Sequence, residues 1–219
     1  MLTRSMTAEL EAGLWVVLSL AARPLAAYLW PRLQDKAGEW SEALEAFAPW
    51  LHAVGPFYLS LLTGAVLGSR LGIYGFGLEG SLLGGLFGIV ILAGFYAVRR
   101  FGPQGIELPA PPAMDKALQD EMRWGFYRGA AAGWLGHLWL GGLAGLGLAV
   151  VEWAATLRPW NSSVWKEPAQ WSALVRAGIS ATLYGLSGNL WLILVVQTLG
   201  VVIWELELAQ NESEAGNQE

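Results

Sequence analysis

The chain lacks cysteine and has only two histidines. The absence of cysteine among 219 residues excludes disulfide bonds and thiolate metal sites. The two histidines, His52 and His137, lie far apart in the sequence, which argues against a zinc site. We therefore expect no bound metal.

Several motifs of soluble enzymes are also missing. There is no P-loop, no dinucleotide-binding glycine motif after a strand, no HExxH and no EF-hand loop. The net charge of −5 argues against a basic surface that would bind nucleic acid. We expect no cofactor and no nucleic-acid partner.

Charge is scarce, and long apolar runs take its place. Charged residues make up 14% of the chain, whereas soluble domains carry about 25%. Apolar runs at 81–98, 129–151 and 190–204 approach the ~20 residues that cross a bilayer. Many of the 13 tryptophans lie near the ends of such runs, where an indole suits the membrane interface. The sequence predicts an all-α, multi-pass protein of the cell membrane, a bundle of about six spans surrounded by lipid.

The N-terminal half has interrupted apolar segments. Residues 13–31 form a first candidate span, in which Arg23 and Pro24 predict a kink or a partly interfacial position. Residues 32–49 are acidic and amphipathic and predict a helix lying at the membrane surface. A second span follows and is broken at Arg70, where the next glycines predict a turn or a re-entrant bend.

Residues 81–98 form the clearest span. Gly80, Gly84 and Gly88 lie four residues apart, a spacing that lets a neighbouring helix approach closely in lipid. The connection that begins at Arg99 is the most basic one in the chain. The positive-inside rule therefore places it on the cytoplasmic side.

The C-terminal half contains a predicted span at 125–151 and an apolar stretch at 172–204. That stretch has 33 residues, and the sequence LSGN at 186–189 interrupts its apolar character. We therefore expect two spans, or one span and a half-helix. The acidic sequence from Glu205 predicts a disordered tail. The expected organisation is N-terminal membrane helices with the interfacial segment at 1–110, a core at 111–205 and the tail at 206–219.

Charges stand directly before an apolar run in QDEMRWGFYRGAAAGWLGH, residues 119–137. Glu121 and Arg128 are seven residues apart, so on a helix they share a face within about 20° and lie about 10 Å apart along the axis. In one interpretation Asp120 and Arg123 mark the water boundary and Arg128 snorkels towards it. In the other, Glu121 and Arg128 turn inward, because ionisable residues within a span are functional candidates.

Four other polar residues need partners. His137 is expected to be a neutral histidine that hydrogen-bonds across a close helix contact, and Glu152 to be either an interfacial acid or an inward-facing one. Asn189 is expected to cap a half-helix, and Gln197 to bond to another helix.

The stretch DEMRWGFYRG, residues 120–129, resembles the glutamate-pair motif of the CPBP family, the Abi or CAAX-protease-like intramembrane proteases. That motif reads Glu-Glu-x-x-x-Arg, often with an aromatic residue before the arginine and a glycine after it. Residues 179–201 are similar to the family's last core helix pair, so the likeness covers 115–205. It implies a helical membrane core in which a glutamate activates water and histidines with an amide stabilise the oxyanion.

The resemblance assigns roles to residues of this chain. Asp120 and Glu121 stand at the glutamate pair, and Arg128 is the partner arginine, three residues later than in the motif. The second motif, Phe-x-x-x-His, has no histidine here, and Glu152 is the nearest polar residue. Gln197 stands where the third motif has its histidine. The implied catalytic residues are Glu121, Arg128 and Glu152, with Asp120, His137, Asn189 and Gln197 as binding residues.

The leading hypothesis is an intramembrane endopeptidase of this type with weakened or altered catalysis, acting on a membrane protein or peptide. A non-catalytic scaffold or binding protein on the same fold is the alternative. A small transporter is a further alternative, since interrupted helices are common in transporters.

Overall fold

The computed structural model describes the chain except residues 1, 39–40, 76, 102–111, 157–167 and 217–219. The described part is all-helical and contains no strand. Its helices are α1 (Leu2–Ala37), α2 (Ser41–Thr63), α3 (Gly68–Leu71), α4 (Leu78–Phe101), α5 (Met114–Leu135), α6 (Leu138–Thr156), α7 (Pro168–Ser187) and α8 (Leu190–Gly216).

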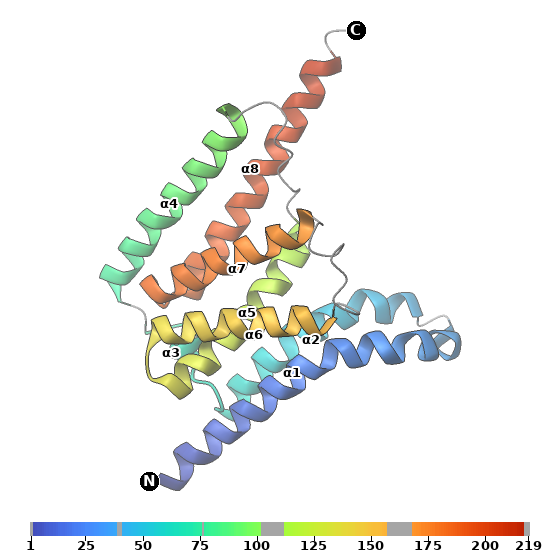
Figure 1. The fold of residues 1–219 in the computed structure, drawn as a ribbon, viewed down its shortest axis with the longest axis vertical. Helices are drawn as coiled ribbons and strands as arrows, with labels where there is room; N and C mark the ends of the chain where they lie inside the picture. Colours follow the sequence, from blue (N-terminus) through green and yellow to red (C-terminus); the bar gives the residue numbers. More distant parts are fainter. Residues whose placement is uncertain (1, 39–40, 76, 102–111, 157–167, 217–219) are drawn as a thin grey trace.

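Helix α5 forms the centre of the bundle. It packs against α1, α2, α3, α6, α7 and α8. Helices α4 and α8 run side by side along one flank, and α1 and α2 lie on another (Figure 1). This arrangement explains why α5 is buried almost continuously from Asp120 to Ala132.

Among the described residues, two helices are long and apolar enough to cross a membrane. They are Leu78–Val98 in α4 and Leu138–Ala155 in α6, with 21 and 18 residues. Only 11% and 28% of these segments are buried inside the protein. Core helices of a soluble protein would be mostly buried, so the exposure of these two favours a lipid environment.

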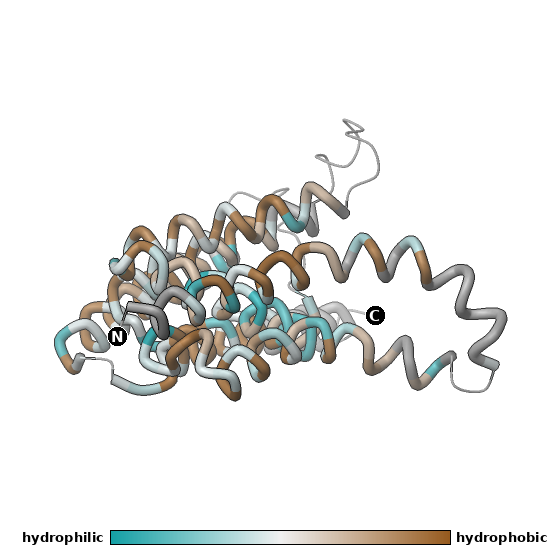
Figure 2. The backbone as a smooth tube through the Cα atoms, turned by 90° about the horizontal axis from the view of Figure 1, so that it is seen from below, coloured by the Kyte–Doolittle hydropathy of each residue, from teal (hydrophilic) through white to brown (hydrophobic). Residues whose placement is uncertain are grey.

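The surface of α4 carries exposed apolar side chains, whereas several charged side chains of the bundle are buried. Large apolar side chains of α4, such as Leu82, Leu86 and Ile89, are exposed, whereas Glu121, Arg128 and Glu152 are buried. Hydrophilic positions gather where the helices cross in the middle of the bundle (Figure 2).

The glycine stripe of α4 packs as predicted. A Cβ at Gly84 would lie 2.8 Å from Leu192 and 2.9 Å from Ser187, and one at Gly88 would lie 2.7 Å from Val196. The small residues thus bring α4 against the α7–α8 pair, which confirms the role expected from their spacing.

The predicted span at 125–151 is wrong as one helix. The chain turns at Gly136, whose φ of 67° is left-handed, and α5 and α6 form an antiparallel hairpin. The glycines of α6 allow the close return, since a Cβ at Gly141 would lie 2.5 Å from Ala132. Repeated glycines in this stretch thus serve a contact between its own two halves.

Other breaks were expected. The segment after α2 bends at Gly64, Gly72 and Gly75, all with positive φ, and the stretch 172–204 divides at Gly188. The two bends meet, because Leu190 N–H donates to the Gly72 carbonyl at 2.9 Å.

Two predictions about the ends of the chain differ from the structure. Residues 32–37 continue α1 and residues 41–49 begin α2, so no separate interfacial helix spans 32–49. Helix α1 includes Pro24 within its bounds. Helix α8 continues to Gly216, past Glu205, where the sequence predicts a disordered tail. The proline-rich loop between α4 and α5 lies mostly outside the described residues.

Candidate functional site: a buried charged network

Glu121 and Arg128 face inward and pair with each other. Glu121 is 0% and Arg128 is 1% exposed. An Nη2–H of Arg128 donates to Glu121 Oε1, and Ser180 of α7 donates to Glu121 Oε2 at 2.5 Å. Arg128 Nη1 also donates to Ser180 Oγ at 2.6 Å. The predicted shared face is confirmed, and both carboxylate oxygens of Glu121 are occupied.

Small and aromatic neighbours enclose this pair. A Cβ at Gly145 of α6 would lie 2.6 Å from Arg128 Cγ, so α6 covers the arginine directly. The guanidinium carbon lies 5.4 Å from the ring centre of Tyr184, a cation–π distance. The pair on α5 is therefore packed by α6 and α7, which also contact each other.

A second group surrounds Glu152, which is also buried. Its Oε1 lies 3.2 Å from His52 Nε2 of α2, and its Oε2 accepts from Tyr127 at 3.2 Å. Arg123 Nε lies 3.0 Å from Oε2 as an ion-pair partner. Ser19 of α1 is 3.0 Å from the Tyr127 hydroxyl. Four helices thus meet at this carboxylate.

Asp120 joins the Glu152 group to α7. It accepts from Arg123 at 2.7 Å and from Arg176 at 2.9 Å. Arg176 stacks over Trp124 at 5.3 Å, and its backbone carbonyl accepts from Gln197 at 3.2 Å. Asp120 and Arg123 therefore belong to the interior and do not mark a water boundary.

The charges of the two groups balance. Three carboxylates, of Asp120, Glu121 and Glu152, face three guanidinium groups, of Arg123, Arg128 and Arg176. Buried ions are tolerated when each has a partner of opposite charge. His52 and Tyr127 are additional titratable groups at this network.

Glu121 and Glu152 differ in what they offer chemically. Glu121 has both oxygens engaged by a guanidinium and a hydroxyl. Glu152 holds an imidazole whose other nitrogen, Nδ1, has no hydrogen-bond partner among the described residues. In many acid–base sites, a carboxylate orients the catalytic histidine in this way.

The structure separates the other predicted binding residues. Gln197 touches the network at Arg176. Asn189 lies at the α7–α8 turn, where its amide donates to Ser81 at 3.3 Å and its side-chain oxygen caps α8 through Leu192 N–H. His137 is exposed at the α5–α6 turn, and its Nδ1 accepts from Trp139 N–H at 3.2 Å. The predicted histidine contact across helices is wrong, because the chain turns at Gly136.

Sequence reasoning did not identify His52, Ser180 or Arg176 as members of the network. A signal existed on α7, where Arg176, Ser180 and Tyr184 recur every four residues and so form a polar stripe on one face. No comparable signal marks His52, whose partner Glu152 is 100 residues away.

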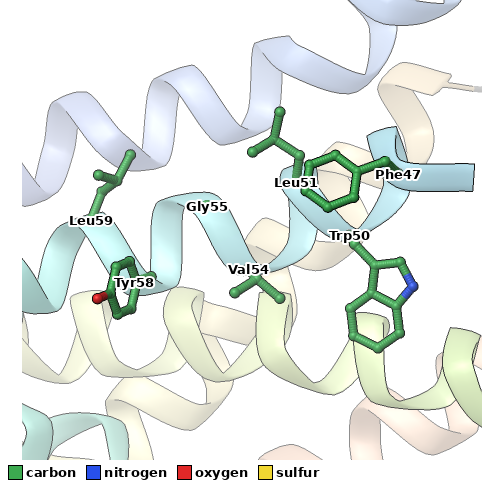
Figure 3. Close-up of a pocket in the computed structure, with 7 residues that line it drawn as sticks. All are labelled: Phe47, Trp50, Leu51, Val54, Gly55, Tyr58 and Leu59. Carbon is green, nitrogen blue, oxygen red and sulfur yellow. The ribbon is translucent and has the colours of Figure 1, made fainter. Parts of the chain in front are cut away.

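An apolar cavity lies on α2, away from the charged groups. It has a volume of about 480 Å³ and is lined by Phe47, Trp50, Leu51, Val54, Gly55, Tyr58 and Leu59. Trp50, Val54 and Tyr58 lie along one side of the helix, and Leu51 and Leu59 along the other (Figure 3). Its lining suits an apolar chain rather than a charged ligand.

Metal-binding geometry is not found in the described part of the chain, where no three His, Asp or Glu residues cluster suitably. No protein-family model, curated protein or solved structure matches the sequence or the fold.

Proposed function

We propose that the chain is a multi-pass protein of the cell membrane, with about six spans. The exposed apolar surfaces of α4 and α6 support this, together with the buried Glu121–Arg128 pair. In water, the exposed leucines would cost free energy by contact with solvent. In a bilayer the same leucines contact acyl chains, and the bundle keeps the ions away from lipid. Helices α2, α5 and α7, with 23, 22 and 20 residues, are long enough to cross as well.

We further propose that the protein is an intramembrane hydrolase with altered acid–base chemistry, in line with its resemblance to CPBP endopeptidases. The observation that carries this proposal is the contact of His52 Nε2 with Glu152 Oε1. The expected family histidines are missing from the C-terminal core, and His52 supplies an imidazole from α2 instead. Glu152, rather than Glu121, is then the carboxylate of the working pair.

The proposed chemistry uses both nitrogens of His52. Glu152 accepts a hydrogen bond from Nε2–H and fixes the ring. Nδ1 is buried and has no hydrogen-bond partner among the described residues, so the chemistry requires a water to enter beside it and give its proton to the Nδ1 lone pair. The water oxygen bonds to a peptide carbonyl carbon, the C–N bond breaks, and the proton passes from Nδ1 to the leaving amine. Tyr127 and Arg123 hold Glu152 in position. The His52 side chain is 14% exposed, and the separate apolar cavity on α2 suits an apolar substrate segment.

A non-catalytic scaffold is the second candidate. The saturation of Glu121 by Arg128 and Ser180 favours it, because a general base needs a free lone pair directed at water. In this function the balanced charges fix the helix register, and the outer surface binds a partner.

The two candidates differ in the effect of His52→Gln. We expect membranes that contain the parent chain to yield new protein N-termini produced by cleavage. His52→Gln should lower the amount of these N-termini at least ~100-fold, which is the lower end of the range for loss of a general base. Glu152→Gln is expected to reduce them by up to about 10⁴-fold, as for loss of the carboxylate that orients a catalytic histidine. His137→Gln is the matched control and should cleave like the parent.

The measurement is N-terminal peptide mapping of membrane fractions, with thermal unfolding of each purified variant as the check on folding. Cleavage that His52→Gln leaves intact would reject the hydrolase. Equal N-termini with the parent and with an empty vector would also reject it and leave the scaffold.

A further inference from the structure

Arg70 has a guanidinium with no acceptor among the residues that the structure describes. It is the basic residue in the last turn of α3 and is half-buried. The guanidinium lies against α5, since a Cβ at Gly133 would be 2.9 Å from its Nη1. Arg70 has no role in the charged network, where the other buried arginines all have carboxylate partners.

The backbone around Arg70 is fixed from several sides. The Tyr184 hydroxyl donates to the Arg70 carbonyl. Gly72 O accepts from Leu190 N–H at 2.9 Å, and Ile73 O accepts from the Trp191 indole at 3.0 Å. The arginine is therefore presented by a rigid segment, which lowers the entropic cost of binding a ligand.

Exposed aromatic rings lie on the same end of the bundle. They are Tyr74, Trp134, Trp139 and Trp191. They come from the bend after α3, the end of α5 and the starts of α6 and α8, which meet at one end of the molecule (Figure 1). The indole of Trp134 donates to the Glu9 carbonyl at 3.3 Å, so this ring too is held in place. Exposed tryptophans with bonded N–H groups are typical of the membrane–water interface.

The position of Arg70 among interfacial aromatic rings indicates which ligand it binds. Headgroup phosphates lie at the level of the aromatic belt, and a guanidinium binds phosphate through two N–H groups. Glu9 and Glu79 are exposed acids on the same end, and neither forms an ion pair with Arg70. The end is therefore not generally cationic, and phosphate recognition rests on the one arginine.

We propose that Arg70, with the surrounding aromatic rings, binds the phosphodiester of a membrane phospholipid at the end of the bundle where α4 begins. The site is independent of the proposed hydrolysis. It holds α3, α5 and the α7–α8 turn at a defined depth in the bilayer.

Photo-crosslinking of the full chain in nanodiscs tests this proposal. The probe is a phosphatidylethanolamine with a photoreactive group next to its phosphate, and adducts are mapped to peptides by mass spectrometry. We expect adducts on the peptides that carry Tyr74, Trp134 and Trp191. Arg70→Gln should lower them about tenfold, as expected for loss of a charge-assisted bidentate contact. Arg100→Gln removes an exposed charge at the far end of α4 and should leave them unchanged.

Two further measurements on the parent chain separate the ligand sources. A photoreactive diacylglycerol, which has no phosphate, should give no such adducts. Millimolar inorganic phosphate should not compete with the phospholipid. Adducts elsewhere in the parent, equal labelling by diacylglycerol, displacement by free phosphate, or labelling unchanged in a folded Arg70→Gln variant would each overturn the proposal.

Discussion

At the scale of single residues, Glu121 and Arg128 show how the bundle holds ions away from water. Each has lost its hydration and is compensated by the other and by Ser180. Removal of one member of such a pair leaves an uncompensated buried charge, which costs about 3–5 kcal/mol. Removal of both leaves no net charge and costs less than the sum of the two single changes.

A double-mutant cycle tests this coupling. We expect Arg128→Gln and Glu121→Gln each to lower the free energy of unfolding by about 3–5 kcal/mol. The double variant should be more stable than additivity predicts, by at least ~1 kcal/mol. The measurement is denaturant unfolding in mixed micelles. Strictly additive losses would mean that the two side chains do not interact as the structure describes.

Only part of this network could be predicted at the residue scale. The spacing of seven residues placed Glu121 and Arg128 on one face, because helix geometry is local. Ser180 bonds to Glu121 across 59 residues, and His52 contacts Glu152 across 100. Such pairings depend on how helices pack, and helix periodicity carries no information about them.

At the scale of elements, the α4 glycines show what spacing alone can and cannot specify. The sequence predicted that one face of α4 approaches a neighbour closely. It did not identify the neighbour, which is the α7–α8 pair. Adjacent glycines of this helix have different surroundings, since Gly84 contacts Leu192 and Ser187 whereas Gly85 has open space.

This difference gives a matched pair of variants. Gly84→Leu should destabilise the fold by about 1–3 kcal/mol or more, the usual cost of overpacking. Gly85→Leu should be within about 0.5 kcal/mol of the parent, because its side chain points outward. Thermal unfolding of both purified variants provides the comparison. Equal destabilisation would show that α4 does not pack through the Gly84 face.

The α5–α6 turn was missed for a related reason. Gly136 looks like one more glycine in a run that suits helix packing, and no proline marks the break. The left-handed φ at Gly136 and the contact of Gly141 with Ala132 became visible only in three dimensions. A single helix at 125–151 would have placed His137 within a span, whereas the turn exposes it.

At the scale of the whole molecule, the ends of the helices define two faces. The α5–α6 turn, the α7–α8 turn and the start of α4 lie at one face, and the end of α4 points away from it (Figure 1). Arg99 and Arg100 near the C-terminal end of α4 predict, by the positive-inside rule, that this end faces the cytoplasm.

Cysteine labelling tests this orientation directly, because the parent chain has no cysteine to interfere. Glu79→Cys and Arg100→Cys put single thiols at exposed positions at opposite ends of α4. In intact cells, a membrane-impermeant maleimide should label the first and not the second, and permeabilised cells should show both. Labelling of both in intact cells, or of neither, would contradict the proposed crossing by α4. Labelling of the second alone would reverse its orientation.

The sequence by itself determined that the protein is helical, that α4 carries a close-packing glycine face, and that Glu121 and Arg128 share a side of one helix. These properties follow from composition and from the 3.6-residue period, which are local. Only the tertiary structure decided that α5 turns back at Gly136, that Asp120 and Arg123 are interior, and that His52 meets Glu152. The physical reason is that a buried ion is stable only where other helices bring its counter-charge, and the order of residues along one helix does not specify those neighbours.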